Sequence, residues 1–99
     1  MPLTIIGRRW FERTNGNTYH SVEIYDENGK QLARVPFAYG YGSQYQQTAL
    51  AECVKLGLYS DERGPHGGHV DYRKFTFSKE SGGDGNLFSV SDVKRKKDL

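Results

Sequence analysis

The sequence predicts a small α+β domain in which a single antiparallel sheet carries one amphipathic helix on one face. Three observations lead to this fold class. Two Asn-Gly pairs, Asn15-Gly16 and Asn28-Gly29, separate three runs rich in β-branched and aromatic residues. One run with helical periodicity follows them, and two shorter alternating runs come later. The expected order along the chain is therefore β-β-β-α-β-β.

Three strands are expected ahead of the helix, over residues 3–11, 18–26 and 31–37. Short turns join them, which predicts an antiparallel meander. Alternation in the first strand places Arg8 and Trp10 on one face and Arg9 on the other. Both faces carry apolar side chains, so the sequence leaves the buried face open. Pro36 lacks an N–H group and marks either the end of the third strand or a sheet edge.

The helix is expected to begin at Ser43, because Gln46 three residues later completes a capping-box pattern. Gly57 is a typical C′ residue and is expected to end the helix. The apolar side of the helix gathers residues at helical spacing, namely Tyr45, Ala49, Cys53 and Leu56, with Leu50 and Val54 at its border.

The pattern beyond the helix predicts two more strands. Residues 70–78 alternate, with two phenylalanines on one face, and predict a fourth strand. Residues 87–93 predict the last strand. Residues 94–99 are mostly basic and predict a flexible tail attached to a single domain of residues 1–93.

Composition limits the classes of function. The chain has 99 residues, of which 35% are hydrophobic and 13% aromatic, so we expect one small domain with a core of few, large rings. A small core makes a homodimer one possible assembly. The formal net charge is +2, and residues 94–99 contribute four basic groups and one acidic group. Residues 1–93 then hold ten basic and eleven acidic groups, a balance that argues against bulk electrostatic binding of nucleic acid.

The single cysteine, Cys53, excludes an internal disulfide and is typical of a reducing compartment. No apolar run is long enough for a membrane span, and the opening residues lack the pattern of a signal peptide. We therefore expect a cytoplasmic protein that does not bind a membrane.

Arg8, Arg9 and His20 are the first candidates for a binding site. They lie on neighbouring expected strands, and hairpin pairing would bring Arg9 and His20 together. Two guanidinium groups and an imidazole suit a phosphate through charge-assisted hydrogen bonds. The alternative is a pair of solvated arginines with a histidine that hydrogen-bonds the backbone, the commoner situation for charged strand residues.

The second candidate is the stretch between the third strand and the helix, namely Tyr39, Gly40, Tyr41, Gly42 and Ser43. Exposed tyrosines stack on planar ligands, and a loop that leads into a helix exposes N–H groups that favour anions. The spacing of the glycines matches neither a P-loop nor the full dinucleotide-binding motif. The rings have a second interpretation as core filler in a chain that is poor in leucine and isoleucine.

Catalytic and metal-binding motifs are not recognisable in the sequence. No Ser-His-Asp or Cys-His arrangement can be assembled with any specificity, so we expect no catalytic residues and no cofactor. His66 and His69 flank two glycines near several carboxylates, but no second pair of ligands has the spacing of a zinc site. We therefore expect no metal centre.

Three stretches carry a resemblance to known proteins. They are Gly7-Arg8-Arg9-Trp10-Phe11, Gly16-Asn17-Thr18-Tyr19-His20-Ser21-Val22 and Pro36-Phe37-Ala38-Tyr39-Gly40-Tyr41-Gly42. Together they resemble a group of small, uncharacterised proteins encoded by bacteriophages and prophages, over about the first half of the chain, and residues 90–99 extend the resemblance. No activity is established for that group, so the resemblance assigns no residue roles. It implies a phage context, in which small proteins without catalytic motifs act by stoichiometric binding to nucleic acid, to a signalling nucleotide or to a host enzyme.

The favoured function is that of a non-enzymatic, phage-type binding protein for a phosphate-bearing, nucleotide-like ligand such as a host defence signal. In this interpretation Arg8, Arg9 and His20 hold phosphate, while Tyr39 and Tyr41 line the pocket. The first alternative is a protein–protein inhibitor or adaptor that uses the same aromatic surface against a host or phage protein. The second alternative is nucleic-acid binding through the basic residues 94–97. A phage-encoded chain would act in the host cytoplasm.

Overall fold

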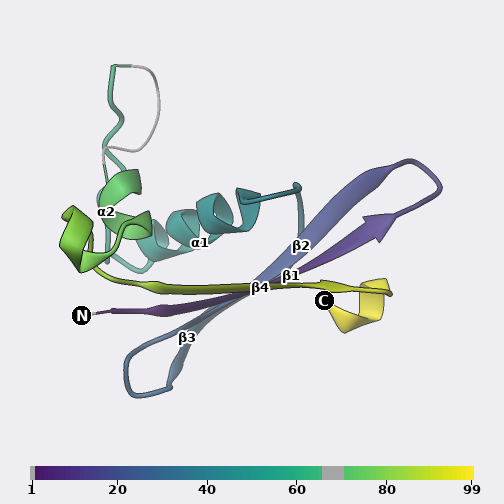
Figure 1. The fold of residues 1–99 in the computed structure, drawn as a ribbon, viewed down its shortest axis with the longest axis horizontal. Helices are drawn as coiled ribbons and strands as arrows, with labels where there is room; N and C mark the ends of the chain where they lie inside the picture. The colour runs from purple at the N-terminus through teal and green to yellow at the C-terminus, as the bar shows by residue number, and fades with distance from the viewer. Residues whose placement is uncertain (1, 66–70) are drawn as a thin grey trace.

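One four-stranded sheet and one main helix make up the fold, in a computed structural model that describes residues 2–65 and 71–99 (Figure 1). The strands are β1 (Thr4–Glu12), β2 (Asn17–Tyr25), β3 (Gln31–Tyr39) and β4 (Leu87–Val93). The helices are α1 (Gln44–Lys55) and the short α2 (Tyr72–Thr76), with 3-10 turns η1 (Lys79–Ser81) and η2 (Lys96–Asp98). The expected α+β class with a helix on one face of the sheet is confirmed.

The strand order in the sheet is β3-β2-β1-β4. β1 pairs antiparallel with β2, and β2 pairs antiparallel with β3, so the expected meander of the first three strands is confirmed. The expectation of a wholly antiparallel sheet is wrong, because β4 runs parallel to β1. After β3 the chain passes over one face of the sheet through α1 and α2, and it enters the sheet again at the opposite edge. Such a crossover makes the last strand parallel to its neighbour.

The fourth strand expected over residues 70–78 is also wrong, because Tyr72–Thr76 is helical. A strand would point Phe75 and Phe77 the same way. In the helical turn, Phe75 is fully buried against Tyr59 and Phe88, with ring centroids 5.2 and 5.4 Å away. Phe77 stays 37% exposed under the guanidinium group of Arg73. The helical turn therefore lets one ring close the end of the core.

The core lies between α1 and the inner face of the sheet. Its buried members are Leu3, Ile5, Val22, Ile24, Tyr45, Ala49, Leu50, Cys53 and Phe75. The ring of Tyr45 lies directly on Gly7 of β1, where an added Cβ would meet it at 2.6 Å. Glycine is therefore required at that point for the helix to approach the sheet.

The ends of α1 match the expected bounds, but their bonding differs at the start. Ser43 is the N-cap residue and makes no side-chain capping bond, so the expected capping box is absent. The side chain of Gln44 accepts the N–H of Tyr41 instead, at 3.0 Å. At the other end, Gly57 N–H donates to Val54 O and Leu58 N–H donates to Cys53 O, the pair of bonds that defines a Schellman motif.

The outer face of the sheet, opposite α1, carries a row of rings across three strands. Tyr19 stacks on Trp10 at 5.8 Å and on Phe37 at 4.6 Å between centroids, and Tyr39 meets it edge-on. We call these four residues the aromatic ladder. They settle the open question of orientation, because Trp10 faces outward and Arg9 faces the helix side.

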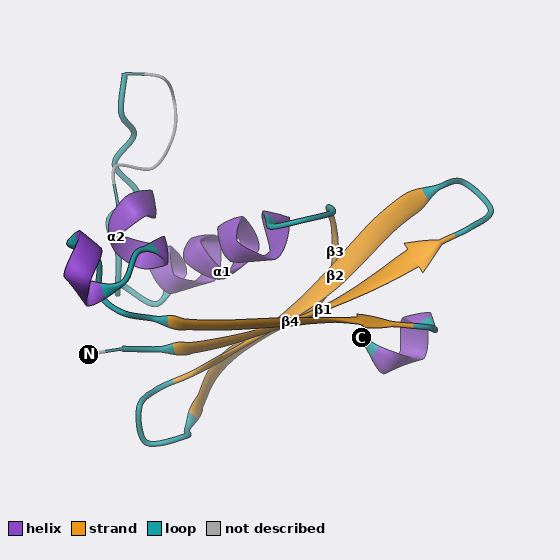
Figure 2. Ribbon diagram, viewed as in Figure 1, coloured by secondary structure: helices purple, strands orange, loops and turns teal. Residues whose placement is uncertain are grey.

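Residues 94–99 lead from β4 across this outer face, and Figure 2 shows η2 on the side of the sheet away from α1. The amine of Lys96 lies 4.7 Å from the ring centroid of Phe37 on β3. Arg34, also on β3, donates a hydrogen bond of 3.1 Å to the backbone oxygen of Leu99. Because β3 and β4 are opposite edges of the sheet, the basic segment spans its width. Of the helices in the described ranges, none is long and apolar enough to cross a membrane.

Candidate functional site

The first candidate site is a hollow on the inner side of the sheet, where β1 and β4 end. It has a volume of about 370 Å³ and is lined by Arg9, Phe11, Thr18, Tyr41, Gly42, Asp92 and Val93, and we call it the Arg9 hollow. Phe11 and Tyr41 are 55% and 70% exposed, so two large rings border it with their surfaces in solvent. The exposed face of an aromatic ring is available to a planar ligand.

The guanidinium group of Arg9 connects the elements that line this hollow. Its Nε donates to the Asp92 carboxylate at 2.8 Å, and its Nη1 donates to the carbonyl of Gly42 at 3.2 Å. The first bond follows from the register, since Arg9 and Asp92 are Cα partners across the parallel β1–β4 pair. The second bond holds the loop before α1 against β1. Arg9 therefore connects two strands and a loop, and part of its charge is balanced by Asp92.

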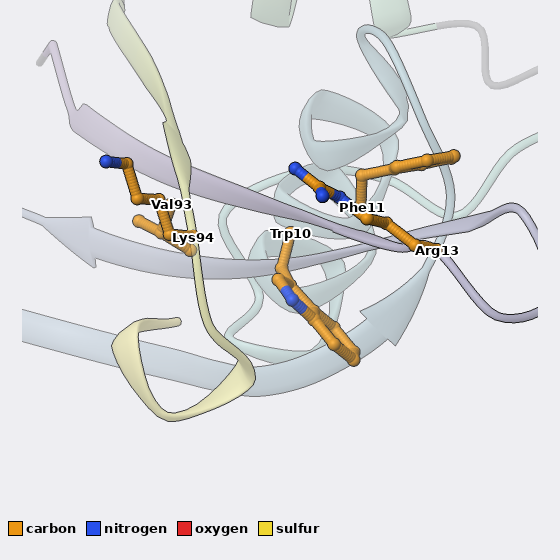
Figure 3. A pocket seen from close by; sticks show the side chains of 5 residues that line it. All are labelled: Trp10, Phe11, Arg13, Val93 and Lys94. Atoms are coloured by element: carbon orange, nitrogen blue, oxygen red, sulfur yellow. The ribbon is translucent and has the colours of Figure 1, made fainter.

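A second hollow adjoins the first at the same end of the sheet. It has a volume of about 510 Å³ and is lined by Trp10, Phe11, Arg13, Val93 and Lys94, and we call it the Trp10 hollow. Figure 3 shows Trp10 on one side of β1 and Phe11 with Arg13 on the other, while Lys94 extends away from them. Phe11 and Val93 line both hollows. The two hollows therefore adjoin at Phe11 and Val93, around the ends of β1 and β4.

Arg13 differs from Arg9 in its bonding. Within residues 2–65 and 71–99, it forms neither an ion pair nor a side-chain hydrogen bond. Its cationic group is therefore available to an anion at no cost of breaking an internal pair.

His20 does not face either hollow. It is 1% exposed and lies beneath the loop, where Nδ1 donates to the carbonyl of Gly40 at 3.1 Å. Its Nε2 bonds to the hydroxyl of Thr48 on α1 at 2.7 Å. The expected proximity of Arg9 and His20 is confirmed by their pairing as Cα partners. The role of His20, however, matches the alternative of a buried histidine bonded to the backbone.

Arg8 and Tyr39 lie on the outer face and line neither hollow. Arg8 forms a 3.1 Å ion pair with Glu23, which Arg34 also approaches at 3.5 Å. Burial would raise the pKa of Glu23, but the hydrogen bond and charge of Arg8, with Tyr25 and Arg34, hold that pKa below its usual value. The expectation that Arg8, Arg9 and His20 surround one phosphate is therefore not met, because the pleat separates Arg8 from Arg9.

The aromatic–glycine stretch is divided by the structure. Tyr41 and Gly42 line the Arg9 hollow, whereas Gly40 supports it from below. Gly40 has φ of 148°, a conformation that favours glycine, and an added Cβ would lie 2.9 Å from Cβ of Gln44, so glycine is needed for the turn itself. Ser43 is exposed at the helix start and lines neither hollow. Of the expected residues, the structure brings together Arg9, Tyr41 and Gly42.

Sequence reasoning did not select six of the lining residues as site residues, namely Trp10, Phe11, Arg13, Thr18, Asp92 and Val93, and it considered Lys94 only as part of the basic segment. Asp92 and Val93 join the site through the parallel pairing of β4, which no local pattern indicates. The described residues contain no group of three or more metal-ligating side chains, and His66 and His69 lie outside them. Comparisons of this chain with protein-family models, with curated proteins and with solved structures give no match. The two hollows are therefore interpreted from their own residues.

Proposed function

We propose that this chain is a non-enzymatic binding protein for a phosphate-bearing, nucleotide-like small molecule. The observation that carries the proposal is the pair of adjoining hollows, in which exposed rings stand next to arginines. Such a combination suits a nucleotide, because its base is planar and its phosphate is anionic. The resemblance to phage proteins makes a host signalling nucleotide the first ligand class to test.

The chemistry of each hollow favours a different part of such a ligand. In the Arg9 hollow, a base would lie against Phe11 and Tyr41, and the carboxylate of Asp92 would accept a hydrogen bond from a ring amino group. The same carboxylate repels a phosphate at that point. In the Trp10 hollow, the guanidinium group of Arg13, which has no ion pair among the described residues, attracts a phosphate. The phosphate is therefore assigned to Arg13 and the base to Phe11 and Tyr41.

The test is titration calorimetry of the parent protein with a panel of mononucleotides, dinucleotides and cyclic nucleotides. We expect at least one of them to bind. Tyr41→Ala should weaken that binding roughly 10-fold or more, because stacking contributes about 1–3 kcal/mol per base. Arg13→Ala should weaken it by a similar factor and should leave the binding less sensitive to salt.

Two matched controls are available in the chain. Tyr39 is 65% exposed, close to the 70% of Tyr41, but lines neither hollow. Arg63 is an exposed arginine that forms a surface ion pair with Asp61 and lines neither hollow. Tyr39→Ala and Arg63→Ala should bind as the parent does. If no nucleotide binds, or if site and control variants bind alike, the proposed function is wrong.

A second candidate is a protein–protein inhibitor or adaptor that uses the aromatic ladder. Phe37 and Tyr39 are 43% and 65% exposed on the outer face, and aromatic residues are favoured at the centres of protein interfaces. This candidate predicts the opposite ranking, in which Tyr39→Ala loses a partner protein that survives removal of nucleic acid and small molecules, and Tyr41→Ala keeps it. Steep salt dependence that disappears on deletion of residues 94–99 would point instead to nucleic-acid binding by the basic segment.

A further inference from the structure

The two edges of the sheet differ in how they are protected against pairing with another strand. The β3 edge contains Pro36, which lacks an N–H group, and its pairing with β2 is interrupted by register shifts. Both features discourage the addition of a strand. The β4 edge has no proline, lysine or arginine among Leu87–Val93, and Asp92 is held by Arg9. In the part of the chain that the structure describes, β4 pairs with β1 alone.

The free edge of β4 presents a defined set of backbone groups. Leu87, the Cα partner of Thr4 on β1, donates its N–H to the carbonyl of Leu3 just before that strand. Leu87 and alternate residues after it therefore direct their backbone groups toward β1. The residues between them, Phe88, Val90 and Asp92, direct both N–H and C=O away from the sheet. These groups have the spacing that an antiparallel strand requires.

The side chains of β4 are complementary to a second β4 in one register. In an antiparallel pair centred on Val90, the full length of the strand is used, and Val90 faces the partner's Val90. Leu87, which is 65% exposed, then lies beside the partner's Val93 on the outer face. Asp92 lies opposite the partner's Phe88, so the register contains no like-charge pair.

We propose that β4 pairs antiparallel with β4 of a second copy of this chain, about a two-fold axis at Val90, and extends the sheet across both copies. The outward N–H and C=O groups of Phe88, Val90 and Asp92 are thereby bonded, and exposed Leu87 is covered. This pairing does not depend on the proposed ligand, although it brings the partner's Leu87 next to Val93, which lines both hollows.

The experiment measures mass in solution by sedimentation velocity at several concentrations. The parent chain is expected to sediment as a dimer. Val90→Lys and Val90→Glu should each sediment as monomers, because like charges would face each other across the axis. Mixed in equal amounts, the two variants should form a heterodimer, since residue 90 meets residue 90 only in this register. Ser89→Lys, which faces the partner's Ser91, should remain a dimer.

Circular dichroism on each variant establishes that it is folded, so that loss of the dimer is distinguished from loss of the fold. A monomeric parent would overturn the proposal and leave the β4 edge open to a strand of another protein. A dimer that survives both charged variants, or charged variants that stay apart when mixed, would overturn it as well. Nucleotide binding by monomeric Val90→Lys is a separate measurement, so failure of the dimer and failure of the proposed function are distinguishable.

Discussion

His20 and Thr48 form a 2.7 Å hydrogen bond that joins the centre of β2 to the middle of α1. The other ring nitrogen of His20 donates to the carbonyl of Gly40, so one buried side chain holds together a strand, a helix and the loop that borders the Arg9 hollow. This relationship makes His20 a structural residue whose loss acts on the site only through the fold.

Replacement of His20 by alanine should lower the free energy of unfolding by roughly 2–4 kcal/mol, because it leaves a cavity and an unpaired buried carbonyl. Thr48→Val, which removes one bond and keeps the volume, should cost only about 1 kcal/mol. Urea denaturation measures both. A His20→Ala protein as stable as the parent but unable to bind the ligand would contradict this and return His20 to the binding site.

Gly7→Ala should destabilise the protein by roughly 1–3 kcal/mol, because the new methyl group meets the ring of Tyr45 at 2.6 Å. Part of that loss should be recovered when Tyr45→Leu is added, since the smaller side chain relieves the overlap. The double-mutant cycle reports this coupling. Strictly additive losses would show that the ring does not lie on Gly7.

The free energy of unfolding should fall in acid because the carboxylate of Glu23 becomes protonated. Its pKa is lowered in the folded protein from an ordinary value of 4.5, so the stabilisation is present above that value and is lost as the pH falls through the folded pKa. Glu23→Gln should therefore flatten the dependence of unfolding free energy on pH below about 4.5. Glu27→Gln, a change at an exposed carboxylate outside the Arg8 cluster, serves as the control. Identical pH profiles for parent and Glu23→Gln would refute the prediction.

Cys53 should be unreactive in the folded protein. Its side chain is fully buried, and burial raises the pKa of the thiol to about 12. At pH 8 only about one thiol in ten thousand would then be ionised, and the thiolate is the reactive form. A disulfide reagent such as Ellman's should modify the protein only after denaturation with urea. Rapid modification of the native protein would mean that α1 separates readily from the sheet.

The local parts of the fold are predictable from the sequence. Asn-Gly pairs define the turns of the first three strands, and Gly57 defines the end of α1, because each depends on residues close together in the chain. The direction of β4 is not local. It follows from the route of the chain over one face of the sheet, and with it comes the pairing of Asp92 to Arg9.

The candidate site is only partly predictable for the same reason. Arg9, Tyr41 and Gly42 lie in local patterns that can be recognised in the sequence, whereas Arg13 and Asp92 become relevant once the ends of β1 and β4 lie together.

Short aromatic runs are a second source of error in the prediction of secondary structure. In residues 72–76 the spacing of phenylalanines suits a strand, yet contact with Tyr59 and Phe88 stabilises a helical turn.

The parallel pairing of β4 with β1 also has a consequence for the order of folding during synthesis. Leu3 and Asn86, 83 residues apart, share a buried hydrogen bond at the start of this pairing. The hairpins of β1, β2 and β3 can form as soon as they leave the ribosome. One edge of β1, however, stays unpaired until β4 has been synthesised. Nascent chains that end before β4 should therefore expose β1 and associate with one another more readily than complete ones.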